Sequence, residues 1–410
     1  MKPRREAQRE ILAAVGSLDS VRVPLKEARG LVLAEPIQAP HDVPPFPNSA
    51  MDGYAVRAAD LEEIPVQLRV IEDVPAGSVP TRKVEPGAAV KIMTGAPMPA
   101  GADTVVEVEV TEPGDRSVKI LASRALGSNV RLAGGDMEAG ARVFERGERL
   151  SPAHLGVLAS LGVVEPLVRR RPVVAVLSTG DELLPPETAV PEPGKIREAN
   201  RTTLIALLAD LAVDTVDFGI VGDDTAALRA TLEEAAGTAD VVITSGGVSM
   251  GEYDLVRAVL ADLGTVAFWK VAQQPGKPFA FGQIKGTPLF GLPGNPVSAI
   301  VSFEQFVRPA LLHMMGATAL FRPQVLGRIA RAVSTNPAKD VFLRVRTGIE
   351  GDALVADLAG GQSSNVLSAM AHADAFALVP VGVGDLEAGD AVTLEMFRWP
   401  ETRTIGALDG

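Results

Sequence analysis

Three glycine-bearing loops hold the residues of this chain whose types and spacing suit the binding of a phosphate group. Their sequences are STGDEL at 178–183, SGGVSMGEYD at 245–254 and GLPGNPVS at 291–298. Each loop follows an apolar run that predicts a buried strand. Glycine lets a backbone approach a ligand closely, and N–H groups in such turns and at helix N-termini favour anions. Glycines after strands also commonly serve only to turn the chain, but three such loops in one region favour a phosphate site. The glycines that allow such an approach are Gly180, Gly246, Gly247 and Gly294, and Ser245 begins the second loop.

Acidic side chains follow the same predicted strands. They are Asp181, Glu182, Asp223, Asp224 and Asp254. Because ligands of an open α/β sheet bind beyond the carboxyl ends of its strands, we expect these carboxylates to gather along one edge. An acid in such a place also serves as a helix N-cap or complements the helix dipole, and this alternative is strong for Asp223 and Asp224. Several acids beside phosphate-type loops nevertheless predict Mg²⁺, which takes one or two carboxylates together with substrate phosphates.

Two lysines lie close in sequence to the third loop. Lys270 and Lys277 belong to the segment FWKVAQQPGKPFAF, in which glycine and prolines frame Lys277. A lysine in such a turn is either solvated or part of an anion pocket. Trp269 is expected in the core rather than as a stacking surface.

The composition excludes several classes of function. The chain has 410 residues, which is too long for one ordinary core. With 47% hydrophobic and 22% charged residues it is globular, and its net charge of −12 and 4% aromatic content argue against a nucleic-acid binder. It has no cysteine and four scattered histidines, which excludes disulfides and thiolate metal sites and disfavours a zinc site. Without a signal-peptide pattern or membrane-length apolar run, a cytoplasmic protein is expected.

The pattern along the chain indicates several domains of different texture. Residues 5–16 and 24–35 predict two amphipathic helices, and short β runs separated by Gly and Pro continue to about residue 150. A helix is expected at 151–163, with Ser151 as its cap and Pro152 in its first turn. Strands and helices then alternate, which predicts a doubly wound parallel-sheet α/β domain, and the texture after residue 322 returns to β. The expected fold is multidomain α/β and β, ending in a C-terminal β-barrel-like domain.

Several motifs, in this order, carry a resemblance to a known family. They are PPFPNSAMDGYAV, KIMTGAPMPAGADTVV, GSNVRLAGGD, STGDEL, TSGGVSMGEYD, FWKVAQQPGKPFAF and GLPGNPVSA. The chain resembles the molybdopterin molybdenumtransferase family, the molybdenum insertases related to the C-terminal domain of gephyrin. The similarity covers essentially the whole chain.

The resemblance implies a reaction and an architecture. Such enzymes act in molybdenum cofactor biosynthesis, take adenylylated molybdopterin and molybdate, need Mg²⁺, and release AMP. The implied domains are an elongated N-terminal domain, a small inserted β domain, a molybdopterin-binding α/β domain and a C-terminal β domain. On this sequence they span 1–42 with 135–168, 43–134, 169–320 and 321–410. The implied partner is a second copy in a homodimer, whose sites lie between the α/β domain of one subunit and the inserted domain of the other. Other cofactor-biosynthesis proteins are further candidate partners; nucleic acid and membrane are not.

Motif by motif, the resemblance assigns roles to residues. The catalytic residues it implies are Asp52, Thr94, Asp136, Glu182, Asp223 or Asp224, Asp254, Pro293 and Pro296. The Mg²⁺ ligands are expected among Asp181, Glu182, Asp223 and Asp254. Substrate binding is expected of Ser245, Gly246, Gly247, Lys270, Lys277, Gly294, Ser298, Arg344 and Ser364. Molybdate is expected on Lys277 and Ser298, with help from Arg344 and Ser364 of the C-terminal domain. Because the chain has no cysteine, the sulfur ligands of the inserted molybdenum must come from the substrate.

Three positions depart from the family pattern, and two alternatives compete with this function. Gln274 stands where some members have a second basic residue, Gly135 lacks an acid that some relatives carry, and Glu198 replaces a usual aspartate. One alternative is an adenylyltransferase or another pyrophosphate-cleaving enzyme on the same α/β module, which the extra β modules disfavour. The other is a non-enzymatic scaffold, which the intact acidic loops disfavour.

Overall fold

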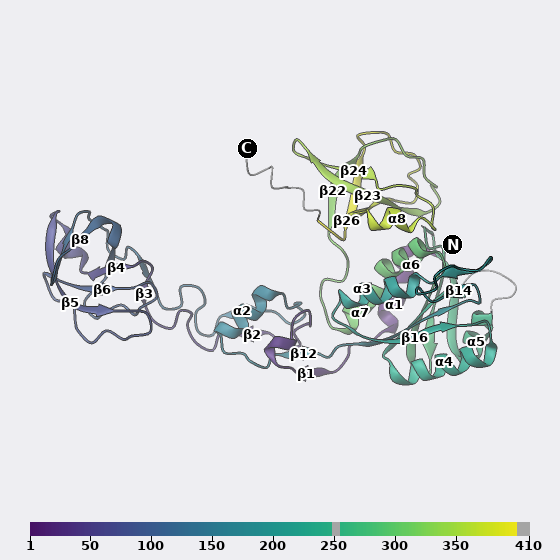
Figure 1. Cartoon of the computed structure of the whole chain (residues 1–410), viewed down its shortest axis with the longest axis horizontal. Coiled ribbons are helices and arrows are strands. Elements are labelled where there is room, and N and C mark those ends of the chain that lie inside the picture. The colour runs from purple at the N-terminus through teal and green to yellow at the C-terminus, as the bar shows by residue number, and fades with distance from the viewer. Residues whose placement is uncertain (248–254, 400–410) are drawn as a thin grey trace.

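The computed structural model describes residues 1–247 and 255–399 of the chain. The molecule is elongated, with a small β module at one end, a slender middle part, and an α/β domain with a C-terminal β module at the other end (Figure 1). Within the described residues, no helix is long and apolar enough to cross a membrane. The multidomain α/β and β architecture predicted from the sequence is confirmed, with a mixed rather than wholly parallel central sheet.

The central sheet has the strand order β16-β13-β17-β21-β20-β18. The first four strands are parallel, and the last two join them in antiparallel pairing. In chain order the strands are β13 (Val173–Thr179), β16 (Asp214–Val221), β17 (Val241–Ser245), β18 (Gly264–Lys270), β20 (Pro278–Ile284) and β21 (Thr287–Leu292). The antiparallel pair comes from the segment that carries Lys270 and Lys277, whose short, proline-interrupted apolar runs gave no clear strand pattern.

Helices cover both faces of this sheet because the side chains of its buried strands point alternately into two cores. Val174 and Val176 of β13 face a core shared with α3 (Asn200–Ala209), whereas Ala175 and Leu177 face α4 (Thr225–Thr238). The first core also receives a π turn (Phe303–Val307) and α7 (Arg308–Met314), which continue from α6 (Pro296–Ser302). On the second face, α5 (Leu255–Leu263) lies beside α4 (Figure 1).

The N-terminal part contains one of the two helices expected in the first forty residues. Helix α1 (Arg4–Ala14) forms and packs against α7 and the π turn of the α/β domain. The helix expected at 24–35 was wrong: only a 3-10 turn (Leu25–Glu27) forms, and Val32 and Leu33 make isolated β-bridges. Gly30 has a φ of 78°, a left-handed conformation that a helix interior cannot contain.

The slender middle part is built from short pairings. Strand β1 (Ser20–Arg22) pairs with β12 (Leu167–Arg169), and β2 (Ile37–Gln38) pairs with β11 (Arg142–Phe144). The expected helix here is confirmed as α2 (Pro152–Ser160), with Ser151 as N-cap.

The inserted module is a six-stranded sheet of order β7-β4-β6-β5-β9-β8. Its strands are β4 (Gly53–Val56), β5 (Val66–Val74), β6 (Ala88–Ile92), β7 (Thr104–Glu107), β8 (Thr111–Pro113) and β9 (Ser117–Ile120). Two 3-10 turns (Ala58–Leu61 and Val108–Val110) lie between them. Strands β3 (Asn48–Ser49) and β10 (Val130–Arg131) pair where the chain enters and leaves the module.

The C-terminal module is a closed β sheet that also takes in a strand from the α/β domain. Its order is β19-β23-β24-β22-β26-β25, and the pairing of β23 with β25 closes it. The module's own elements are β22 (Gln324–Ile329), β23 (Asp340–Glu350), β24 (Ala353–Leu358), α8 (Leu367–Ala371), β25 (Ala375–Val379) and β26 (Ala391–Met396). Strand β19 (Gln273–Gln274) lies between β18 and β20 in the chain, so it ties the two domains together. The barrel-like domain expected here is confirmed.

Candidate functional site

Two predicted acids lie side by side at the carboxyl ends of neighbouring strands. Asp181 follows β13 and Asp223 follows β16. The backbone N–H of Asp223 donates to Oδ1 of Asp181 at 2.9 Å, and the N–H of Asp181 donates to Oδ2 of Asp223 at 3.5 Å. Asp224 instead caps α4, because its carboxylate accepts the N–H of Ala227 at 2.7 Å. Within the described chain, the second oxygen of Asp181 and that of Asp223 accept no hydrogen bond.

A cleft lies where the loops after β13 and β17 diverge. It has a volume of about 140 Å³, and its walls include Glu182, Ser245, Gly246, Gly294 and Pro296. The chain leaves β13 toward β16 on one side and leaves the neighbouring β17 toward β18, β20 and β21 on the other side. The cleft lies at this change of direction, which is where open α/β sheets bind ligands. Five of the predicted site residues therefore meet in one cleft.

Local geometry explains the glycine in the second loop. Gly246 has a φ of 94°, and a Cβ at this position would lie 2.7 Å from the carbonyl oxygen of Thr179. The side-chain amide of Asn200 donates to Oγ of Ser245 at 2.8 Å and to the carbonyl of Gly294 at 2.7 Å. This amide, which the sequence analysis did not select, fixes the second and third loops relative to each other.

Glu198 lies in the wall of the same cleft and is buried. One oxygen of its carboxylate accepts hydrogen bonds from the hydroxyl of Ser178 at 3.0 Å and from the backbone N–H of Arg201 at 2.6 Å. Its other oxygen has no hydrogen bond among the described residues and lies 3.8 Å from Nε of Arg201. Glu198 replaces the aspartate usual at this position, so the wall of the cleft still carries a carboxylate here.

A second cavity opens between the α/β domain and the C-terminal module. Its volume is about 390 Å³. Lys277 and Ser298 line it from the α/β domain, and Lys339 and Ser364 line it from the C-terminal module. The N–H of Val297 donates to the carbonyl of Ser364 at 3.1 Å, which joins the two walls. Lys277, Ser298 and Ser364 were predicted to share a ligand, and the fold brings them together.

The loop at 293–298 belongs to both cavities. Gly294 and Pro296 line the first cleft, while Asn295 and Ser298 line the second cavity. Pro293, the first residue of this loop, is buried. Pro296 is the first residue of α6, where a missing N–H costs no helical hydrogen bond. A ligand in the cleft and an ion in the second cavity would therefore bind on either side of one rigid loop.

Two predicted substrate residues lie elsewhere. Lys270 is exposed at the end of β18 and lines neither cavity. Arg344 is almost fully buried behind the second cavity. Its guanidinium donates to the carbonyl of Phe342 at 3.0 Å and to that of Ser363 at 3.4 Å, so it supports the loop that carries Ser364. Burial lowers the pKa of Arg344 to about 10, which leaves it charged at neutral pH.

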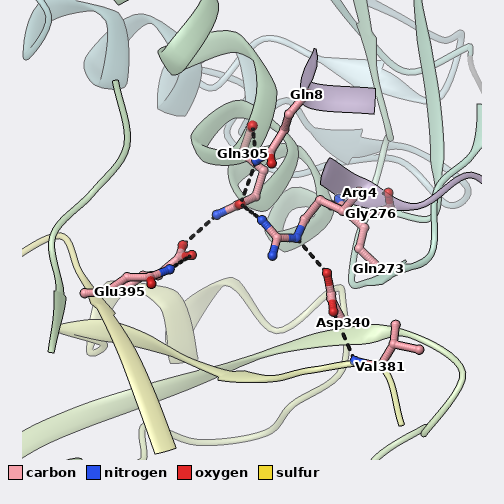
Figure 2. Close-up of polar contacts among 9 residues, drawn as sticks. Arg4, Gln8, Gln273, Gly276, Gln305, Asp340, Val381 and Glu395 are labelled. Carbon is pink, nitrogen blue, oxygen red and sulfur yellow. Dashed lines mark hydrogen bonds and ion pairs between the residues drawn. The ribbon is translucent and has the colours of Figure 1, made fainter. Parts of the chain in front are cut away.

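A polar network anchored by Arg4 holds the two walls of the second cavity together (Figure 2). Nε of Arg4 donates to Asp340 of β23 at 2.8 Å, and its guanidinium donates to Oε1 of Gln305 in the π turn at 3.0 Å. The amide of Gln305 donates in turn to Glu395 of β26 at 2.7 Å. Helix α1 thereby joins the α/β domain to the C-terminal module. No sequence motif marked this network.

The remaining predicted residues lie far from these loops within the chain. In the inserted module, Oδ1 of Asp52 accepts the backbone N–H of Thr94 at 2.7 Å and its hydroxyl at 2.8 Å. Both bonds lower the pKa of Asp52 below its ordinary value, and the backbone bond has the larger effect. Asp136 is exposed where the chain leaves the module. The module lies at the opposite end of the molecule from the α/β domain (Figure 1).

The carboxylates fit a magnesium ion held partly by a substrate. Asp181 and Asp223 each keep one oxygen free of hydrogen bonds from described residues, and Mg²⁺ commonly takes one or two carboxylates and completes its shell with phosphates and water. Residues 1–247 and 255–399 contain no cluster of three or more acidic, histidine or cysteine ligands. The predicted ligand Asp254 lies outside the described residues.

Comparison with known proteins gives consistent matches over the whole chain. Residues 2–162 match the model of the MoeA N-terminal region (domain I and II), residues 175–313 that of a probable molybdopterin binding domain, and residues 327–397 that of the MoeA C-terminal region (domain IV). Molybdopterin molybdenumtransferase 2 of Mycobacterium tuberculosis is 40% identical over 400 residues, covering 95% of this chain and 98% of its own. Molybdopterin molybdenumtransferase of Haemophilus influenzae is 39% identical over 381 residues, covering 91% and 93%.

Solved structures match to the same extent. The molybdopterin biosynthesis moeA protein of Pyrococcus horikoshii OT3 superimposes with a TM-score of 0.82 at 29% identity, over 97% of this chain and 100% of that one. A second crystal structure of a moeA protein from Pyrococcus gives a TM-score of 0.77 at 35% identity, over 97% and 99%.

Proposed function

The chain belongs to the molybdopterin molybdenumtransferase family of molybdenum cofactor biosynthesis, and on this premise we propose that it transfers molybdenum from molybdate to adenylylated molybdopterin with release of AMP. The observation that carries the proposal is the pair of cavities on either side of loop 293–298. One is bordered by glycine loops and carboxylates, which suits a phosphoanhydride with its metal. The other holds lysines and hydroxyls, which suits a tetrahedral oxyanion.

In this proposal the residues of the cleft bind the phosphorylated part of the substrate. The backbone at Gly246, Gly247 and Gly294 approaches the phosphates closely, as glycine permits. Asp181 and Asp223 hold Mg²⁺, with Glu182 and Asp254 as the further ligands implied by the family motifs. When bound there, Mg²⁺ supplies neutralisation of the charge on the phosphoanhydride as its bond breaks.

The second cavity binds molybdate. Lys277 contributes a positive charge, and the hydroxyls of Ser298 and Ser364 donate hydrogen bonds to the oxyanion. Molybdate bound there is separated from the cleft only by loop 293–298. Arg344 acts through the loop that it supports, and the protein supplies no sulfur ligand because it contains no cysteine.

We further propose that the working unit is a homodimer. Asp52, Thr94 and Asp136 carry family motifs, yet one chain keeps them at the opposite end of the molecule from the cleft (Figure 1). A second copy related by a twofold axis, with its long axis antiparallel to that of the first, brings its inserted module to the cleft of the first. Each of the two sites then uses residues of both chains.

The test is an assay of AMP release from adenylylated molybdopterin with Mg²⁺, with and without molybdate. The expected result is release that depends on both ions, with molybdenum recovered on the pterin. Release indifferent to molybdate would favour a simple pyrophosphate-cleaving enzyme, and formation of adenylylated molybdopterin from ATP would favour an adenylyltransferase. Tight binding without turnover would favour a scaffold.

A further inference from the structure

We propose that Lys339 is a second cation of the oxyanion cavity and shares the bound molybdate with Lys277, an inference that rests on the proposed function. Lys339 is half-buried, belongs to the C-terminal module and lines the same cavity as Lys277 and Ser298. Its Nζ donates to Oε1 of Gln274 at 3.4 Å. Neither lysine forms an ion pair with a carboxylate of residues 1–247 or 255–399. The cavity therefore holds two positive charges without a protein counter-ion.

The backbone around Lys339 is fixed, unlike that of an incidental surface lysine. Strand β19 pairs in parallel with β23, with Gln273 opposite Asp340 and Gln274 opposite Val341. The N–H of Asp340 donates to the carbonyl of Ala272 at 2.9 Å, and the carboxylate of Asp340 accepts from Arg4 at 2.8 Å and from the N–H of Val381 at 3.1 Å (Figure 2). This network places Lys339 directly against the wall that carries Gln274 and Lys277.

The chemistry of the pair Gln274 and Lys339 suits an oxyanion. An ammonium group has three donors, and the hydrogen bond to Gln274 uses one of them. The amide of Gln274 is neutral, so it orients Lys339 without cancelling its charge. Molybdate carries two negative charges, which match the combined charge of Lys277 and Lys339. Because these lysines belong to different domains, a bound oxyanion also links the α/β domain to the C-terminal module.

The test compares wild type, Lys339→Gln and Lys339→Arg in two assays. The first titrates molybdate in the AMP-release reaction and follows the requirement for adenylylated molybdopterin separately. The second measures binding of molybdate alone to the substrate-free protein by calorimetry. Lys285→Gln is the matched control, because Lys285 is an exposed lysine of the α/β domain outside the cavity. Thermal unfolding of each variant reports whether its fold is retained.

We expect Lys339→Gln to raise the molybdate requirement and the molybdate dissociation constant by about ten- to a hundredfold, the loss typical of one charge-assisted contact. The requirement for adenylylated molybdopterin should stay near that of wild type, Lys339→Arg should recover most of the affinity, and Lys285→Gln should change neither. A merely structural role would affect both substrates alike and would not be rescued by arginine.

Unchanged molybdate binding in Lys339→Gln, or equal losses for both substrates, would overturn the inference. The calorimetric arm keeps this result separate from the proposed function. If wild type binds molybdate in a Lys339-dependent manner but releases no AMP, the cation site stands and the proposed reaction fails. If AMP release depends on molybdate but not on Lys339, the reaction stands and the site at Lys339 fails.

Discussion

Lys277 provides the most direct test of the oxyanion cavity at the scale of one residue. We expect Lys277→Ala to cost about 1.5–3 kcal/mol of molybdate binding, roughly ten- to a hundredfold in the concentration required, because one charge-assisted contact is lost. Excess molybdate should partly restore turnover, and the binding of adenylylated pterin should stay near normal. A molybdate titration of AMP release measures this; equal molybdate dependence in variant and wild type would mean that Lys277 serves the phosphates or only the fold.

The neighbourhood of Lys277 shows what sequence can and cannot reveal about a site. The local pattern of glycine and prolines left Lys277 either solvated or in an anion pocket, and the family resemblance implied molybdate as its ligand. Gln274 stands where some members have a second basic residue, and in the structure Nζ of Lys339 lies 3.4 Å from its Oε1. Lys339 is far away in sequence, and only the pairing of β19 with β23 brings it close. No periodicity or spacing encodes a contact between two domains.

Asp52 gives a prediction that depends on protonation. Its pKa lies below the ordinary value because Thr94 donates a backbone and a side-chain hydrogen bond to the ionised carboxylate. Thr94→Ala removes only the hydroxyl bond, so the pKa should rise toward, but not reach, its ordinary value. The stabilisation from this pair exists above the unfolded-state pKa and is lost as the pH falls through the folded-state pKa. In the variant only the folded-state pKa changes, so this stabilisation should be smaller and its loss should be complete at a higher pH than in wild type.

The measurement for Asp52 is an NMR titration of its carboxyl carbon in wild type and Thr94→Ala. Thr111→Ala is the control, because the Thr111 hydroxyl in the same module donates to the carbonyl of Val108 rather than to a carboxylate. An unchanged pKa in Thr94→Ala would show that the backbone bond alone sets the ionisation of Asp52.

At the scale of elements, helix α1 is a clamp between two domains. Arg4 of this helix bonds both Gln305 of the α/β domain and Asp340 of the C-terminal module (Figure 2). We expect Arg4→Met to weaken this junction by about 1.5–3 kcal/mol, the contribution of a hydrogen bond to a charged group. Amide exchange should speed up at Asp340, whose N–H bonds to Ala272 across this junction, and at Val381, whose N–H bonds to the Asp340 carboxylate that Arg4 also contacts.

The measurement is the amide exchange rate of each peptide at the junction between the two domains, followed by mass spectrometry. Arg9→Met is a suitable control, because Arg9 lies on the same helix, is exposed and forms no ion pair with any residue that the structure describes. If Arg4→Met leaves exchange around residues 340 and 381 at the wild-type rate, the other links between the domains suffice, such as the pairing of β19 with β23 and the packing of Val297 and Ile300 on Phe342.

The elements themselves were predictable where hydrophobic patterns are long and uninterrupted. The four parallel strands and the helices between them follow directly from alternating apolar and amphipathic runs. The helix expected at 24–35 failed at Gly30, whose left-handed backbone serves a turn. The antiparallel strands β18 and β20 were missed because prolines and glycine separate their short runs, and the sheet rather than the local pattern stabilises them.

At the scale of the whole molecule, the separation of Asp52 from Asp181 determines how the active unit must be built. One chain holds them at opposite ends of an elongated molecule (Figure 1). Local motifs single out both residues, but they carry no information on the distance between them. The domain boundaries given in the sequence analysis stay a prediction. If both residues serve one reaction, a second chain must supply one of them, and a closed twofold dimer creates two equivalent sites.

Mixed dimers test this arrangement. Asp52→Ala and Asp181→Ala homodimers should each be inactive, since every site carries one lesion. In a heterodimer one site combines the intact Asp181 of the first subunit with the intact Asp52 of the second, while the other site carries both lesions. Random exchange gives about half heterodimers, each with one working site, so activity should return to roughly a quarter of wild type.

The measurement is AMP release after co-refolding, with heterodimers verified by two affinity tags. Co-refolding of either variant with itself should restore nothing. Persistent inactivity of purified heterodimers would place both residues in the site of one subunit, which would require the elongated chain to fold back on itself.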